Sequence, residues 1–272
     1  MPVPPSARPS KGGRGLRRRQ QRAGSRAAQK YLVLRRQWRR RTRRLWVAVA
    51  AVLTGMALAA NVALLFLPPT RPWAWSAGAI TGGLWAMYLY ARDDPPQYIA
   101  NWLVGSEGEK QTEKTLRPLE REGWRVHHDL AAAYGSGNLD HVVIGPGGVF
   151  LLDSKKFGGE VTVDDSQAIV RRLEDRSLSY HYDAGKGVVP LALDVRDRLR
   201  KGTRATQYVH AVVVVWGDFP QQVAEGRCTY VHGDHLVAWL RSQPLRVAPN
   251  RVEQFSGVLA QVETRAGALD SA

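Results

Sequence analysis

The stretch Asn138-Leu-Asp-His-Val-Val-Ile-Gly-Pro-Gly-Gly-Val-Phe-Leu-Leu-Asp-Ser-Lys155 is the most informative part of the chain. Two apolar, β-branched runs flank the turn sequence Gly145-Pro-Gly-Gly148, and this pattern is typical of a β-hairpin. A turn that is symmetric about its two central residues pairs Ile144 with Val149. The sequence therefore predicts two antiparallel strands in this register.

The same register places Asp140 directly opposite Asp153. Period-2 alternation puts Asp153 and Lys155 on one face and Ser154 on the other. Two opposed carboxylates, with Cβ atoms about 5 Å apart, repel each other unless a divalent cation lies between them. Their hard oxygens suit Mg²⁺ or Mn²⁺. Two acids and a lysine around such an ion are suited to phosphodiester hydrolysis.

The pattern Asp140…Asp153-x-Lys155 resembles the core of the PD-(D/E)xK nucleases. The surrounding sequence, over about residues 101–215, is similar to the NERD (nuclease-related domain) family. This resemblance implies a restriction-endonuclease-like α/β core, in which helices flank a central mixed sheet. It also implies metal-dependent cleavage of DNA or RNA. The segments that carry it are Gly105-x-x-Gly108-Glu109, Leu139 to Lys155, and Gly158-Gly159.

The resemblance also assigns roles to individual residues. It implies that Asp140, Asp153 and the backbone carbonyl of Ser154 bind the metal. It directs Glu109 inward, to orient water or complete the metal shell, and it uses Lys155 to activate water and offset transition-state charge. Each residue has a purely structural alternative: the acids can be solvated strand-end or helix residues, and the lysine can simply pair with its neighbouring aspartate.

The net charge of +15 is concentrated at one end of the chain. Residues 1–44 hold sixteen Lys and Arg and no Asp or Glu, so residues 45–272 hold 23 basic and 24 acidic side chains. The predicted nuclease-like domain therefore lacks bulk basic character, and nucleic acid would have to bind a local patch. We expect residues 1–44 to be largely disordered, although Gln29–Arg44 can become helical on a surface.

Three interpretations of this basic segment are open. It can be a topology signal, an attractor of anionic lipid head groups, or a direct nucleic-acid binder. We favour the first two together, because the segment directly precedes an apolar stretch.

Two uncharged stretches predict a transmembrane hairpin. Leu45–Leu67 has 23 residues, and Trp73–Tyr90 has 18 with aromatic residues at both ends. The connection Pro68–Pro72 is short, so both ends of the hairpin lie on one side. The basic segment places that side, and both termini, in the cytoplasm of a two-pass cell-membrane protein. A buried hairpin of a soluble protein is the alternative. The single cysteine, Cys228, fits a reducing compartment.

The remainder predicts a linker over 91–100 and one α/β domain over 101–272. Its helices are expected at 105–117, ending at Pro118, and at 190–200, 234–241 and 250–265. Its strands are expected at 124–129, 139–144, 148–155, 160–163, 169–173 and 210–216.

Two functions compete on this sequence. The first is a membrane-anchored, metal-dependent nuclease on the cytoplasmic face, with Glu109, Asp140, Asp153 and Lys155 as its catalytic residues. The second is a non-catalytic membrane-anchored nucleic-acid-binding or scaffold protein with a nuclease-like fold. The neutral domain charge favours the second function, as does Leu193, which stands where relatives usually carry Gln. Nothing in the sequence specifies an oligomeric state.

Overall fold

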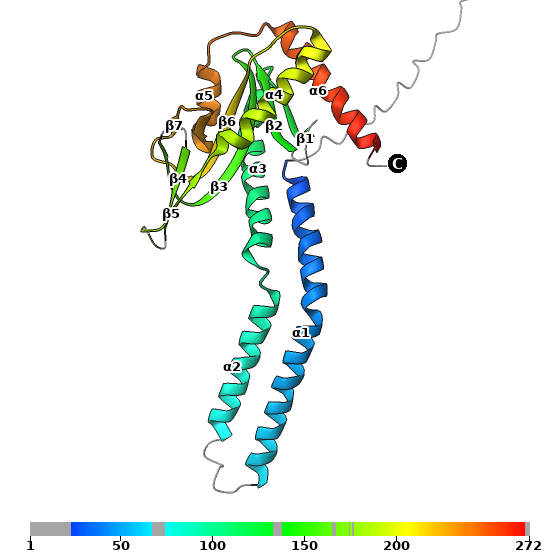
Figure 1. The fold of residues 1–272 in the computed structure, drawn as a ribbon, viewed down its shortest axis with the longest axis vertical. Helices are drawn as coiled ribbons and strands as arrows, with labels where there is room; N and C mark the ends of the chain where they lie inside the picture. The colour runs from blue at the N-terminus through cyan, green and yellow to red at the C-terminus, as the bar shows by residue number, and fades with distance from the viewer. Residues whose placement is uncertain are drawn as a thin grey trace, which may run out of the picture.

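The computed structural model describes residues 23–66, 74–132, 138–164, 167–173, 175 and 177–269. The helices are α1 (Ser25–Phe66), α2 (Ala74–Asp93), α3 (Gln97–Arg121), α4 (Ala184–Thr203), the 3₁₀ turn η2 (Gly233–His235), α5 (Leu236–Ser242) and α6 (Pro249–Leu269). The strands are β1 (Arg125–Ala131), β2 (Asn138–Gly145), β3 (Gly148–Asp164), β4 (Gln167–Arg172), β5 (Ser179–Tyr182), β6 (Val209–Asp218), β7 (Val223–Ala224) and β8 (Thr229–His232). Helices α1 and α2 form a long stalk, and the other elements form an α/β unit at its end (Figure 1).

The α/β unit is built on one mixed sheet of eight strands. Its main path runs β1-β2-β3-β6-β8-β7, and β4 and β5 extend from the far half of β3. The pairs β3–β6 and β6–β8 are parallel, and the other neighbouring strands are antiparallel. The expected α/β fold, with helices flanking a mixed sheet, is confirmed.

Helices cover both faces of this sheet. Successive residues of β3 alternate between them: Leu151 packs with α4 and α6, whereas Leu152 packs with α3 and α5. Val213 and Val214 of β6 divide in the same way, and all four side chains are at most 1% exposed. Burial on both faces explains why these strands are continuous apolar runs in the sequence.

The predicted β2–β3 hairpin is confirmed in its register, because Ile144 pairs with Val149. A glycine is required at position 145 of this hairpin, because the Trp124 ring lies very close to the backbone there. A Cβ atom added at Gly145 would lie 2.0 Å from the ring of Trp124, which is packed against the turn. The turn sequence and the packing of the neighbouring strand therefore support the same register.

Strand β3 is longer than predicted. The strands expected at 148–155 and 160–163 are one strand of 17 residues, with a register shift against β6 between Lys156 and Glu160. At Gly159 a Cβ would lie 2.2 Å from the Arg171 carbonyl oxygen. The glycine thus lets β3 approach β4 closely at the point where its register against β6 shifts. Strands β5, β7 and β8 were not predicted.

Two helices begin earlier than predicted. Helix α3 begins at Gln97, which reduces the expected linker over 91–100 to residues 94–96, and Pro118 lies inside it. Pro118 cannot donate a backbone hydrogen bond to the preceding turn, and the buried Leu116 and Leu119 hold the last turns in place of that bond. Helix α4 begins at Ala184, six residues before Pro190. Asp183 caps this start, because its Oδ1 atom accepts a hydrogen bond from the Lys186 backbone amide.

The expectation of a largely disordered segment over 1–44 is wrong from Ser25 onward; residues 1–22 lie outside the described part. A single helix of 42 residues, α1, joins the arginine-rich stretch to the apolar one. The basic half lies beside α3 and the apolar half beside α2 (Figure 1). Arg, Ala, Leu and Gln are good helix formers, and packing against α3 adds to that propensity.

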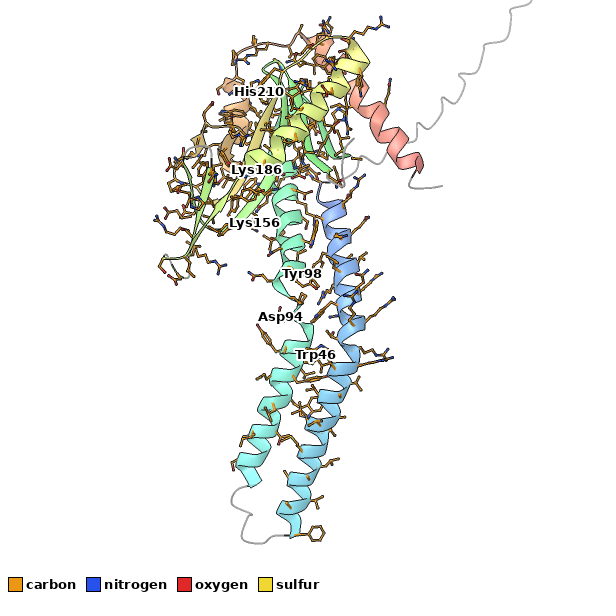
Figure 2. All side chains as sticks on the ribbon, viewed as in Figure 1. Trp46, Asp94, Tyr98, Lys156, Lys186 and His210 are labelled. Atoms are coloured by element: carbon orange, nitrogen blue, oxygen red, sulfur yellow. The ribbon has the colours of Figure 1, made fainter. Side chains whose placement is uncertain are left out.

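One helix of the described chain, α1, is long and apolar enough over Ser25–Ala60 to cross a membrane. Its most apolar window has a mean hydropathy of 1.4 and no buried residues. Trp46 of α1 is labelled in Figure 2. Its ring meets that of Tyr88 of α2 edge to face, with ring centroids 5.8 Å apart. The predicted connection Pro68–Pro72 lies outside the described residues.

Candidate active site

The two aspartates of the hairpin lie where its paired section ends. Backbone pairing stops at His141 opposite Leu152, so Asp140 and Asp153 are the next residues in register. There the Asp140 Oδ2 atom accepts a hydrogen bond from the backbone amide of Ser154 at 3.0 Å. Residues opposite each other in an antiparallel pair share a face, so the two carboxyl groups lie on the same side of the sheet.

The carboxyl group of Asp140 is partly buried and lies near other acids. Burial raises its pKa well above the usual value, and the charges of Asp153 and Glu109 raise it further. Lys155 and the hydrogen bond from the Ser154 amide act in the opposite direction but do not outweigh burial. In this surrounding, Asp140 favours either a proton or an added positive charge.

Lys155 supplies the positive charge of the cluster. Its Nζ atom lies 2.8 Å from both carboxylate oxygens of Asp153. Burial alone would lower the pKa of Lys155, but Asp153 and Asp140 raise it above its usual value. The side chains of Asp153 and Lys155 are 19% and 31% exposed, so the pair is open to a ligand from solution.

Glu109 reaches this cluster from helix α3. Burial raises its pKa to about 7, with Asp129 as the next largest cause and Asp153 as a smaller one. A hydrogen bond from the Gly24 backbone and the charge of Lys155 lower the pKa in part. Glu109 therefore changes its protonation near neutral pH, as a group that exchanges protons with a substrate or water must do.

The side chain of Ser154 faces away from the carboxylates. Its hydroxyl lies 2.7 Å from Thr112 Oγ1, which also donates to the Gly108 carbonyl at 3.1 Å and accepts from Trp216 Nε1 at 2.8 Å. This buried network joins α3 to β3 and β6, one turn from Glu109. Only the backbone of Ser154, not its hydroxyl, is directed toward the acidic cluster.

The five residues described above, Glu109, Asp140, Asp153, Ser154 and Lys155, lie within one matched stretch. Residues 104–216 match the nuclease-related domain family. This stretch is similar to the NERD domain. It runs from the middle of α3 to the end of β6, and leaves α1, α2, α5 and α6 outside the match. No curated protein and no solved structure matches the chain.

Tyr182 also belongs to this cluster, although the sequence did not predict it there. It ends the unpredicted strand β5, and its ring meets Phe157 edge to face at 5.6 Å. Burial raises the pKa of Tyr182, and the charge of the neighbouring Lys155 is the largest effect in the opposite direction. The alternation Tyr180-His-Tyr182 is a strand signal, but nothing in it indicates a contact with Lys155.

Asp129 is a second residue near the cluster that the sequence did not predict. Its side chain is buried, and it accepts hydrogen bonds from Ser25 Oγ at 2.7 Å and Asn138 Nδ2 at 2.8 Å. It is also the second strongest influence on the pKa of Glu109. The partner Ser25 lies 104 positions away in sequence, so no local pattern could have predicted this contact.

Asp140 and Asp153 carry hard carboxylate oxygens, the type of donor that divalent cations such as Mg²⁺ prefer. Asp140 and Asp153 provide carboxylate oxygens on one face, and the backbone of Ser154 lies between them. Within the described part of the chain, no group of three or more His, Cys, Asp and Glu is arranged to hold a metal ion. A two-carboxylate and carbonyl set, completed by water, is what these residues can supply. Leu193, 44% exposed on α4, makes no polar contribution.

Proposed function

We propose that this chain is a membrane-anchored, metal-dependent nuclease of the PD-(D/E)xK type, which hydrolyses phosphodiester bonds of DNA or RNA. The carrying observation is that Glu109, Asp140, Asp153 and Lys155 form one electrostatically coupled cluster inside a NERD domain. Coupled acids with raised pKa values are typical of functional sites. The mixed sheet with flanking helices supports a restriction-endonuclease-like core over residues 101–272.

Asp140, Asp153 and the Ser154 carbonyl would hold Mg²⁺ or Mn²⁺. The cluster has three carboxyl groups and one ammonium group, and the pKa values of Glu109 and Asp140 are raised. This imbalance favours a dication. When bound, such an ion polarises the phosphodiester and lowers the pKa of coordinated water.

The remaining residues would act on water and phosphate. Lys155 keeps its charge, because Asp153 and Asp140 stabilise the ammonium form, so it can offset charge that develops on phosphate oxygens. Glu109, with a pKa of about 7, can accept a proton from the attacking water at neutral pH. Tyr182 would keep Lys155 in place.

The anchor would be two-pass, with α1 and α2 both in the cell membrane and both termini in the cytoplasm. Apolar side chains on the outer surface of α2 support this arrangement: Ile80 is 65% exposed and Met87 is 69% exposed. The Trp46–Tyr88 contact holds the two helices together near the end of the basic segment. Sixteen cations before the apolar part of α1 favour a cytoplasmic N-terminus.

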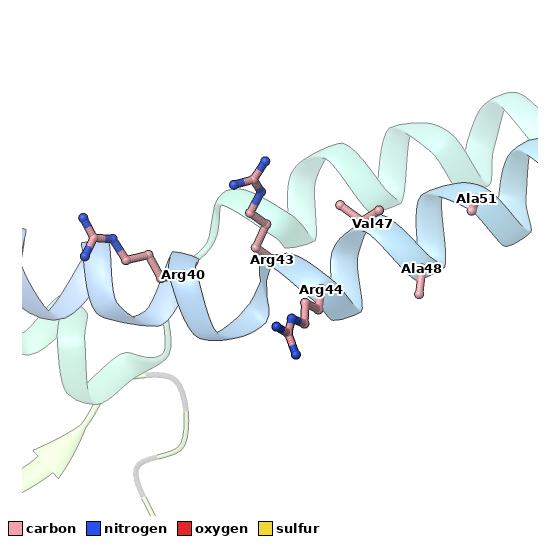
Figure 3. Close-up of a pocket in the computed structure, with 6 residues that line it drawn as sticks. All are labelled: Arg40, Arg43, Arg44, Val47, Ala48 and Ala51. Atoms are coloured by element: carbon pink, nitrogen blue, oxygen red, sulfur yellow. The ribbon is translucent and has the colours of Figure 1, made fainter.

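The basic segment would bind anionic lipids. Three exposed arginines stand directly before apolar residues on one side of α1, and together they line a groove of about 580 Å³ (Figure 3). The arginines can bind a lipid phosphate while the apolar residues contact its acyl chains. The lining residues are Arg40, Arg43, Arg44, Val47, Ala48 and Ala51.

The second candidate is a non-catalytic scaffold or nucleic-acid-binding protein. The residues after the basic segment carry 23 basic and 24 acidic side chains, and Lys155 contacts both oxygens of Asp153. In that case the cluster is a structural ion network.

A cleavage assay separates the two. The full chain in lipid nanodiscs is incubated with supercoiled DNA, single-stranded DNA and RNA, in Mg²⁺, Mn²⁺ or EDTA. We expect metal-dependent cleavage that Asp153→Asn lowers by several orders of magnitude. Mn²⁺ should also raise the thermal stability of the wild type, and Asp153→Asn should lose that response. Neither cleavage nor stabilisation by metal in the wild type would leave the scaffold as the better proposal.

A further inference from the structure

The first turn of α1 docks onto the NERD domain beside Glu109. Ala23 is 1% exposed, and its backbone amide donates to Glu113 Oε2 at 3.0 Å. Gly24 has a φ of 70° and lies against α3 so closely that an added Cβ would be 2.7 Å from the Ser106 carbonyl oxygen. The chain therefore turns sharply on the surface of α3 immediately before α1 begins.

The carboxylate of Asp129 also contacts this turn. Its Oδ2 atom accepts from Ser25 Oγ at 2.7 Å and from the Arg26 amide at 3.4 Å. The Asp129 side chain thus caps the N-terminus of α1 from a distant part of the chain, where the helix dipole favours negative charge. Arg26 adds a second link, because its Nη1 atom donates to Asn138 Oδ1 at 2.7 Å.

The backbone of Asp129 is held in an unusual conformation. Its φ is 56°, in the left-handed region that non-glycine residues rarely adopt, and the residue is 2% exposed. Such strain persists only where surrounding contacts fix the residue. Here the contacts come from Ser25, Arg26 and Asn138, so α1 contributes directly to the conformation of β1 at this point.

We propose that the first turn of α1, clamped by Asp129, is part of the candidate active site and positions Glu109. The clamp contacts α3 about one turn to either side of Glu109, at Ser106 and at Glu113. The Gly24 backbone also donates a hydrogen bond to Glu109, and Asp129 has the largest effect of any charged group on the Glu109 pKa. Residues 23–26 and the membrane-directed part of α1 lie outside the NERD match at 104–216. The anchor helix is thus a positioning element, and a domain fragment without it has an incomplete site.

The inference rests on the proposed function for its kinetic consequence, but its structural consequence can be measured separately. Ser25 is the residue to change, because its hydroxyl makes the clamp and its position at the helix start tolerates substitution. Ser25→Ala removes the cap, and Ser25→Thr retains a hydroxyl. Glu253→Gln is the matched control, because it removes an exposed ion pair to Arg125 on the same strand, β1.

Hydrogen exchange of the full chain in nanodiscs reports the structural consequence. In Ser25→Ala, we expect amides of residues 26–28 and 107–112 to exchange about fivefold to tenfold faster, as loss of a cap predicts. Residues 55–66 should not change, Ser25→Thr should restore protection, and Glu253→Gln should resemble wild type. Faster exchange confined to 26–28 would overturn the inference, because α1 would then be attached without holding Glu109.

Kinetics report the functional consequence. We expect Ser25→Ala to lower kcat about tenfold with little change in KM, and Ser25→Thr to recover most of it. Unchanged kcat in a protein that cleaves nucleic acid would also overturn the inference. If the wild type cleaves nothing but exchange still rises at 107–112, the nuclease proposal fails while the positioning of Glu109 by α1 stands.

Discussion

Glu109 is the residue at which the electrostatics of the cluster are most informative. It comes from helix α3, whereas Asp140, Asp153 and Lys155 come from the β2–β3 hairpin. Burial and Asp129 raise its pKa to about 7, while Gly24 and Lys155 limit the rise. The folded protein therefore binds a proton at Glu109 more tightly than the unfolded chain does, and folding stability must depend on pH.

The direction of this dependence follows from the raised pKa. Between the ordinary value of 4.5 and about 7, the folded state holds more protons, so stability falls as pH rises through this range. In EDTA, we expect the free energy of unfolding to decrease from pH 5 to pH 8, with Glu109 contributing about 1–3 kcal/mol. Denaturant titrations at each pH should show a clearly smaller decrease for Glu109→Gln.

A matched control is available on the same helix. Glu107 is exposed and pairs with Lys156, so Glu107→Gln should keep the wild-type dependence. A Glu109→Gln slope equal to that of wild type would contradict the raised pKa. Asp140 contributes in the same direction, because its pKa is also raised, so Glu109→Gln should not remove the dependence completely.

At the scale of elements, the β2–β3 hairpin determines where the acids lie. A one-residue slip would move Asp140 to the opposite face from Asp153. The observed register depends on the turn and on the ring of Trp124, which occupies the space that a side chain at Gly145 would need. The hairpin turn is therefore a position at which a methyl group should disturb the site.

Gly145→Ala tests this dependence. The added Cβ would lie 2.0 Å from the Trp124 ring, and relief of the clash requires the ring or the hairpin to move. We expect a loss of about 2–3 kcal/mol in unfolding free energy, typical of overpacking. Gly158→Ala, on the partner strand β3, is the control, because nothing lies within 4 Å of its added Cβ. Equal stabilities for the two variants would contradict this account.

Helix α1 is expected to bind anionic phospholipid. Its exposed Arg40, Arg43 and Arg44 precede an apolar groove surface. We expect native mass spectrometry of the full chain, released from mixed vesicles, to retain anionic phospholipid rather than zwitterionic phospholipid. Replacing all three arginines by Gln should remove most of that lipid, because the phosphate loses its cationic partners. Retention of anionic lipid by the triple variant would locate the lipid elsewhere.

In the proposed membrane-anchored arrangement of the whole molecule, the stalk would set the distance between the candidate site and the membrane. The helix rises about 1.5 Å per residue, so Ser25 lies roughly 30 Å along α1 from Leu45, where the apolar stretch begins. Helix α3 runs beside this basic half (Figure 1). A nuclease held in this way would act on nucleic acid close to the membrane surface.

The proposed topology places both termini in the cytoplasm and Pro68–Pro72 outside. In a Cys228→Ser background, an impermeant thiol reagent added to intact cells should label Thr70→Cys. It should not label Ser177→Cys, although Ser177 is exposed on the α/β unit. The expected asymmetry follows from the cations that precede the apolar part of α1. Labelling of Ser177→Cys in sealed cells would refute the orientation.

Local sequence determined the features that depend on neighbouring residues. The glycine-rich turn and the alternation around it specified the hairpin, the pairing of Ile144 with Val149, and hence the proximity of Asp140 and Asp153. The apolar run after Arg44 specified a helix able to cross a membrane. In each case the deciding interactions join residues a few positions apart, or depend on composition over one helix length.

Tertiary structure alone decided the features that depend on distant contacts. Tyr182 reaches Lys155 only because β5 pairs with β4, and Asp129 meets Ser25 only because α1 folds back along α3. The beginning of α1 was predicted to be disordered because the prediction used charge and composition. These indicate how well a segment is solvated, but not which distant residues it packs against. Its order comes from contacts with residues about a hundred positions away, and no local pattern encodes the free energy of such contacts.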